Sequence, residues 1–174
     1  MLSDQNEKIY STLERLSDFY LTGYIIKVTQ LLSDDVILLS YGRRFVKRVG
    51  KDDVMKYYEK LSKDLRRIDH PLRFANGKIA IPPREAKIHL SPQIICISSL
   101  SNMFLGAIED GVISKDDYDL ESIPSTNKPC LLLLHRDSNN HSGQIVDIDL
   151  NEKGKIRKIV LYHSRMFLYH PYMQ

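Results

Sequence analysis

The sequence predicts an α+β fold, with helices in the first part of the chain and strands in the rest. Before residue 66, apolar residues recur at three- and four-residue spacing in three segments, which is typical of helices with one buried face. After residue 71 they form short runs or alternate with polar residues, which is typical of strands. The 174 residues carry 25 Lys and Arg against 22 Asp and Glu, and 43% are hydrophobic. We therefore expect a single globular domain over residues 1–174.

Three segments have the pattern of helices. In the first, Ser3 or Asp4 can cap the start and Gly23 can end the helix. A short second helix is expected from Tyr24, and the polar residues 33–35 should break it before an apolar strand at 36–39. Gly50 and the aspartates after it open a third helix. The apolar positions of the three helices are Ile9, Leu13, Leu16 and Tyr20; Ile25, Val28, Leu31 and Leu32; and Val54, Tyr57 or Tyr58, Leu61 and Leu65.

The remaining chain predicts strands separated by turns. Asn76-Gly77 predicts a hairpin within residues 72–81. Residues 88–105 form one long or two shorter strands, interrupted near Pro92 or at residues 98–101. Residues 130–135 are apolar throughout and predict a central strand. Residues 144–150 alternate, with Val146 and Ile148 on one face, and turn at 152–154 into a return strand at 156–163. The acidic residues 109–129 predict a loop insertion.

Several motifs resemble the nuclear-transport-factor-2-like superfamily, which includes SnoaL-like and ketosteroid-isomerase-like proteins. They are Leu-Leu-Ser-Asp-Asp-Val at 31–36, Gly-Lys-Asp-Asp-Val at 50–54, the pair Tyr57-Tyr58, and the closing hairpin around 149–162. The resemblance implies a cone of three N-terminal helices packed in a strongly curved antiparallel sheet, with an apolar pocket open at one end. Members of the superfamily include enzymes as well as docking and transport adaptors, so the fold does not settle the function.

The residues of ketosteroid-isomerase chemistry are missing from the matching positions. That reaction needs a carboxylate base that removes a proton, and a tyrosine and a protonated acid that together hold the developing oxyanion. By the resemblance these positions fall on Ser40, Leu16 and Val146. We therefore do not expect catalysis of this type.

Other residues could still form a site in the cone. His163 and Tyr58 are the candidates for catalysis, because an imidazole and a phenol can act as general acid and base. Alternatively, His163 bonds a tyrosine in the core and His135 is a solvated strand end. The expected pocket lining is Tyr20, Tyr24, Tyr57, Phe104, His135, Val146, Ile148, Ile159 and Leu161.

The sequence supports two kinds of function. The first is a pocket protein for a small, largely apolar ligand, alone or with lyase-, isomerase- or cyclase-type acid–base chemistry. The second is a non-catalytic interaction or transport adaptor, which could use the basic segment 41–51, the acidic insertion or the aromatic tail 166–173 to hold a protein partner.

We expect neither cofactor nor metal, because phosphate-loop and metal-ligand spacings are missing. Cys96 and Cys130 should be reduced core residues of a cytoplasmic protein. The resemblance implies a homodimer. We expect no membrane insertion, because the longest nearly apolar stretch, residues 94–108, is too short to span a membrane. We also expect no nucleic-acid binding, since the net charge is only +3.

Overall fold

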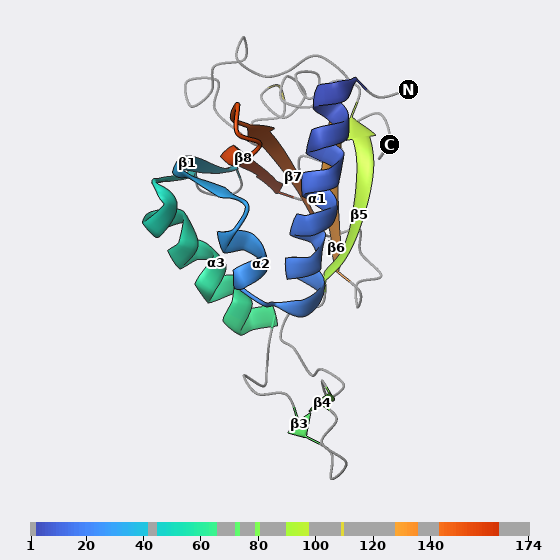
Figure 1. Cartoon of the computed structure of the whole chain (residues 1–174), viewed down its shortest axis with the longest axis vertical. Helices are drawn as coiled ribbons and strands as arrows, with labels where there is room; N and C mark the ends of the chain where they lie inside the picture. Colours follow the sequence, from blue (N-terminus) through green and yellow to red (C-terminus); the bar gives the residue numbers. More distant parts are fainter. Residues whose placement is uncertain are drawn as a thin grey trace.

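The computed structural model describes residues 3–41, 45–65, 72–73, 79–80, 90–97, 109, 128–135 and 143–163. Helices α1, α2 and α3 belong to the N-terminal part of the chain and lie beside a six-stranded sheet (Figure 1). The helices are α1 (Asp4–Thr22), α2 (Ile26–Thr29) and α3 (Lys51–Leu65). The strands are β1 (Leu32–Tyr41), β2 (Val46–Val49), β3 (Leu72–Arg73), β4 (Ile79–Ala80), β5 (Leu90–Ile97), β6 (Lys128–His135), β7 (Gly143–Leu150) and β8 (Ile156–His163).

The main sheet has the strand order β2-β1-β8-β7-β6-β5. The pairing of β1 with β8 is parallel, whereas the other neighbours pair antiparallel. The α+β class and the cone-like arrangement are therefore confirmed, with the amendment that the sheet is mixed rather than wholly antiparallel. Strands β3 and β4 form the predicted hairpin, but as a separate two-stranded sheet whose turn residues lie outside the described part.

The first helix has the predicted ends. The Ser3 hydroxyl accepts a hydrogen bond from the Asn6 N–H at 3.2 Å, and Gly23 ends α1 with a positive φ of 73°. Helix α3 also matches its predicted start, because Gly50 precedes it with a φ of 89°. The second helix is shorter than predicted. It starts at Ile26, and Leu32 belongs to β1.

Strand β1 contains the polar residues 33–35, which we expected to separate the second helix from the strand. Four residues of β1, Ser33 to Val36, face a single residue of β8, since Leu32 pairs with Ile156 and Ile37 with Lys158. The Ser33 hydroxyl donates to the Ile156 carbonyl oxygen at 2.9 Å, which holds this bulge against β8. The prediction of a break was wrong because the polar residues sit in a bulge, where a strand tolerates them.

The later strands follow the predicted pattern with two corrections. Pro92 lies inside β5 and does not interrupt it, which is tolerated because β5 is the edge strand of the sheet. Lys128 and Pro129 belong to β6 rather than to the acidic insertion. Apart from Glu109, which is exposed, residues 109–127 lie outside the described part, as do residues 98–105 and the aromatic tail.

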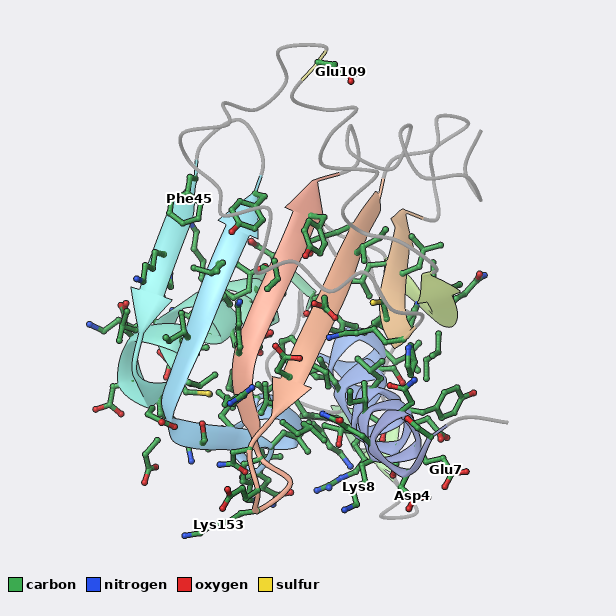
Figure 2. The ribbon with its side chains drawn as sticks, turned by 90° about the horizontal axis from the view of Figure 1, so that it is seen from above. Asp4, Glu7, Lys8, Phe45, Glu109 and Lys153 are labelled. Carbon is green, nitrogen blue, oxygen red and sulfur yellow. The ribbon has the colours of Figure 1, made fainter. Side chains whose placement is uncertain are left out.

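The core lies between the helices and one face of the sheet, which we call the helix-covered face. Helix α1 packs against β5, β6 and β7, while α3 packs against β1 and β2 (Figure 1). The strands contribute alternate residues to this core, among them Leu38, Leu131, Val146, Ile148 and Ile159. In Figure 2, Phe45 and Lys153 mark the two opposite ends of the strands.

Candidate functional site

A cluster of aromatic side chains fills the middle of the helix-covered face. Tyr20 of α1 and Tyr58 of α3 are 1% and 0% exposed, and Phe19 lies between them. The Phe19 ring meets Tyr20 edge-on at 5.2 Å and Tyr58 at 5.4 Å between centroids. Tyr57 meets Tyr58 in the same way at 5.1 Å. Such edge-to-face contacts are favourable, so the rings are held in fixed positions.

The Tyr20 and Tyr58 hydroxyls are buried without a proper partner. Among the described residues, neither oxygen takes part in a hydrogen bond of normal geometry. Burial raises the pKa of both tyrosines above the usual value, and the two hydroxyls affect each other's pKa. The two hydroxyls are therefore neighbours, and even where Tyr20 donates to Tyr58, the Tyr58 hydroxyl keeps a proton that it can donate to a third group. Because they remain protonated, they are hydrogen-bond donors rather than bases.

Tyr57 extends this cluster toward the strand ends. Burial raises the pKa of Tyr57 to about 12, and the side chains of Gln144 and Arg48 act in the opposite direction, so both lie near its hydroxyl. Gln144 is the second residue of β7, and its partner in the neighbouring strand β8 is His163. Residues directly opposite in an antiparallel pair share a face, so the backbone places His163 on the helix-covered face.

The structure brings most of the predicted lining together. Tyr20, Tyr58, Val146, Ile148, Ile159 and Leu161 belong to one buried cluster, and Tyr57 packs against it. Tyr24 follows α1 and is half-buried. His135 and His163 end their strands, but their side chains lie outside the described part, as does Phe104. The pocket and its catalytic residues thus remain predictions.

Sequence reasoning missed Arg48 and Gln144. Arg48 belongs to the basic segment 41–51, which we interpreted as a surface for a protein partner, and Gln144 was only the polar start of an alternating strand. A signal for Arg48 was present, because alternation along residues 46–49 puts Arg48 and Lys47 on opposite faces. Nothing in the sequence shows that Gln144 approaches Tyr57.

The opposite face of the sheet holds a different polar cluster. The Lys128 ammonium lies 2.7 Å from Asp147 Oδ1 and 3.1 Å from Asp149 Oδ1, and it donates to the Ile148 carbonyl oxygen at 3.1 Å. The Cys130 thiol donates to Asp147 Oδ1 at 3.6 Å. Burial alone would lower the pKa of Lys128, but the two carboxylates outweigh it and raise that pKa. All three ammonium protons have acceptors, which indicates a structural role.

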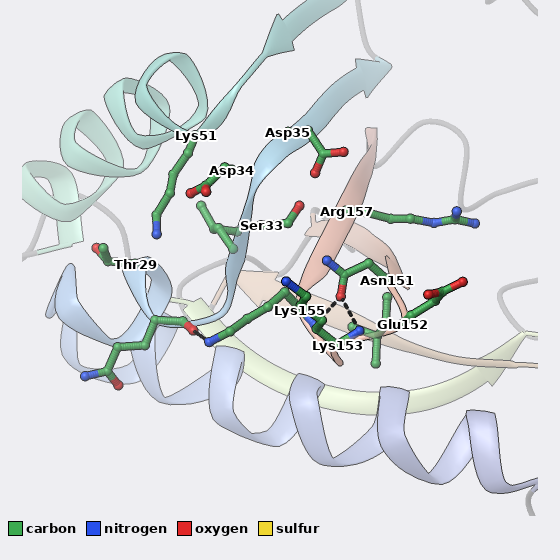
Figure 3. A pocket seen from close by; sticks show the side chains of 13 residues that line it. Thr29, Ser33, Asp34, Asp35, Lys51, Asn151, Glu152, Lys153, Lys155 and Arg157 are labelled. Atoms are coloured by element: carbon green, nitrogen blue, oxygen red, sulfur yellow. Dashed lines mark hydrogen bonds between the residues drawn. The ribbon is translucent and has the colours of Figure 1, made fainter.

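An open cleft of about 800 Å³ lies at the end of the sheet marked by Lys153 (Figure 3). Asp34, Asp35 and Lys51 line one side, and Asn151 and Lys155 line the other. The charged side chains are of both signs and mostly exposed. The cleft therefore does not favour one class of ligand.

The described residues form neither a metal-binding cluster nor a membrane-spanning helix. Within these ranges, no three His, Cys, Asp or Glu side chains gather in a way that could hold a metal ion. None of the described helices has the length and apolar character needed to cross a membrane.

Comparison with solved structures identifies the fold. A Bacillus subtilis protein named a "putative isomerase" has a TM-score of 0.50 at 13% identity, over 92% of this chain and 88% of that chain. The chain has the nuclear-transport-factor-2-like fold. An NTF2-like protein of unknown function from Mesorhizobium loti has 7% identity and a TM-score of 0.47, over 94% of this chain and 96% of that chain. No protein-family model and no curated protein sequence matches the chain.

The structure shows where the residues lie that occupy the three positions of isomerase chemistry. Leu16 and Val146 are both 0% exposed and pack in the core, while Ser40 is a half-buried residue of β1. Neither leucine nor valine can hold an oxyanion. The donors that this interior does contain are Tyr20, Tyr57 and Tyr58, which come from other positions of the helices.

Proposed function

We propose that the interior of the fold binds a small, largely apolar molecule that carries an oxygen able to accept a hydrogen bond. The observation that carries the proposal is the pair of buried hydroxyls on Tyr20 and Tyr58, which have no proper partner among the described residues. A buried polar group left unsatisfied costs about 1–3 kcal/mol. Native proteins contain few such groups, and each calls for an explanation.

A ligand oxygen would account for both hydroxyls. Phenylalanine at either position would fill nearly the same space without the cost, so packing alone does not explain a tyrosine there. A carbonyl oxygen can accept two hydrogen bonds and would satisfy both donors. The surrounding side chains, such as Leu13, Val146 and Leu161, are apolar and suit an apolar ligand body.

Acid–base chemistry is the further part of this proposal. With the carbonyl oxygen held by Tyr58, a base could remove a proton from the adjacent carbon, and the electron pair would move onto that oxygen. Since the tyrosines stay protonated, the base must be another residue, for which His163 remains our candidate. The reaction class would be that of lyases, isomerases or cyclases.

Native mass spectrometry of the protein purified from its own cells tests the binding. We expect a retained small molecule that is released on denaturation and is lost from a Tyr20→Phe/Tyr58→Phe variant. Tyr10→Phe is the matched control, because Tyr10 lies on the same helix and is 39% exposed. Retention of the molecule by the double variant would contradict the proposal.

The stability of the ligand-free protein gives an independent test. If the hydroxyls serve a ligand, Tyr58→Phe should leave the free energy of unfolding unchanged or raise it, since it removes an unsatisfied group. If instead the hydroxyls satisfy each other, the same change should cost about 1 kcal/mol. Denaturant unfolding separates the two results.

An adaptor function is the second candidate, and the edge strand β2 favours it. Val46 and Val49 are 41% and 58% exposed on a strand whose one neighbour among the described strands is β1. Exposed apolar residues on an edge strand are typical of docking sites. Val49→Lys should weaken complex formation in a pull-down if this edge binds a partner, and an unchanged complex would discard the edge.

A further inference from the structure

The geometry around β2 and α3 points to an anionic ligand. This inference rests on the proposed interior site: we infer that the bound molecule carries a carboxylate and that Arg48 holds it.

Arg48 leaves β2 on the helix-covered face. Its register partner in β1 is Leu38, which is 0% exposed in the core, and opposite residues of an antiparallel pair share a face. The side chain of Arg48 is 32% exposed, so it is partly enclosed but reachable from solvent. An arginine at this position stands at the border of the interior rather than on the outer surface.

Among the described residues, the partners of the guanidinium group all bind it through Nη1. Nη1 lies 3.3 Å from Asp53 Oδ1 and 3.4 Å from the Asp53 carbonyl oxygen. Within the described part of the chain, Nε and Nη2 have no partner, and Nε is buried. The Nε–Nη2 edge is the one that binds a carboxylate through two parallel hydrogen bonds. The described part of the chain thus leaves a carboxylate-binding edge unsatisfied.

The contact with Asp53 does not account for Arg48. Its distances exceed the 2.7–2.9 Å or so of good charge-assisted hydrogen bonds. Asp53 also has a second partner, because its Oδ2 accepts the Val49 N–H at 3.3 Å, and it lies in the first turn of α3, where a negative charge is favourable. Asp53 can therefore keep Nη1 while a ligand occupies the other edge.

Tyr57 connects Arg48 to the aromatic cluster. Asp53 and Tyr57 are four residues apart on α3 and so lie on one side of the helix, beneath the guanidinium group. The guanidinium group is near enough to affect the Tyr57 hydroxyl, which Gln144 also approaches. A ligand with its carboxylate on Arg48 would extend its apolar body past Tyr57 toward Tyr58.

Paired probes of equal length test the charge of the ligand. We would measure the binding of octanoate and octan-1-ol by isothermal titration calorimetry to the full chain and to Arg48→Met. The wild-type protein should prefer octanoate by about tenfold or more, the size expected for hydrogen bonds to a charged group. Arg48→Met should abolish this preference but still bind octan-1-ol. Lys47→Met is the matched control, because it removes one positive charge from the other face of the same strand.

The results distinguish the interior site from the carboxylate of the ligand and from the role of Arg48. Equal binding of octanoate and octan-1-ol to the wild-type protein would overturn the carboxylate and leave the interior site standing. A preference that survives Arg48→Met, or that Lys47→Met removes, would overturn the role of Arg48. Failure of both probes to bind would overturn the interior site and this inference with it.

Discussion

Lys128 offers the sharpest test of how the protein tolerates buried charge. Lys128 and Asp147 are 6% and 2% exposed, and their charged atoms lie 2.7 Å apart. Lys128→Met removes the ammonium group and keeps most of the apolar volume. Asp147 would then be a buried carboxylate without a counter-charge, a change that costs about 3–5 kcal/mol. This is a large share of the 5–15 kcal/mol or so that stabilises a typical domain.

Urea unfolding at pH 7 measures this cost. With a slope of about 2 kcal/mol per molar urea, the midpoint should fall by roughly 2 M. Lys60→Met, at an exposed position of α3, should stay within about 0.5 kcal/mol of the wild-type protein. A Lys128→Met/Asp147→Leu variant should recover most of the loss, since the carboxylate that still lacks Lys128 is then the partly exposed one of Asp149. A loss below about 1 kcal/mol in the single variant would refute the reasoning.

The pH dependence of Lys128→Met gives a second readout. Burial already raises the pKa of Asp147, and Lys128 opposes this only in part. Without Lys128 that pKa should rise further above its unfolded value. The folded protein then binds the proton more tightly than the unfolded chain, so the variant should gain stability as the pH falls through the folded pKa. A variant whose stability does not improve relative to the wild-type protein as the pH falls would contradict this account.

Two substitutions and one pH profile test the core, a turn and the burial of Tyr57. Phe19→Ala should cost about 3–5 kcal/mol in denaturant unfolding, because the side chain is 0% exposed, whereas Leu21→Ala, 49% exposed, should cost far less. Gly154→Ala should cost about 1 kcal/mol from its φ of +78° alone, since nothing lies within 4 Å of the added carbon; an unchanged midpoint would count against strain in this turn. The pKa of Tyr57 is about 12 in the folded protein, so above about pH 10 its hydroxyl ionises more readily in the unfolded chain. The free energy of unfolding should therefore fall by at least about 1 kcal/mol between pH 9 and 11. A flat profile over that range would contradict the buried state of the hydroxyl.

Elements defined by local chemistry could be predicted from the sequence. The ends of α1 depend on Ser3 and Gly23, which act through hydrogen bonds and backbone angles within a few residues. The closing hairpin is equally local, because Asn151 Oδ1 accepts the N–H groups of Lys153 and Lys155 at 3.0 and 2.9 Å. For such elements the sequence window contains every partner that matters.

Elements that depend on distant partners could not be predicted. The bulge of β1 needs Ser33 to bond Ile156, 123 residues later. Alternation correctly placed Asp147 on the face opposite the core, but it cannot show that Asp147 is buried there with Lys128. The same limit applies to the candidate site. The pattern could place Tyr58 in the core, whereas the lack of a partner for its hydroxyl emerges only from the packed structure.

The two faces of the sheet treat buried polar groups differently, and this contrast supports a function for the interior. On the opposite face, burying the ammonium group of Lys128 is compensated by two carboxylates and a carbonyl oxygen. On the helix-covered face, the hydroxyls of Tyr20 and Tyr58 and the Nε of Arg48 are buried without such compensation in the described part of the chain. A chain that satisfies a full charge on one face has the means to satisfy neutral hydroxyls on the other. This contrast supports the ligand proposed above, which would supply acceptors for these groups.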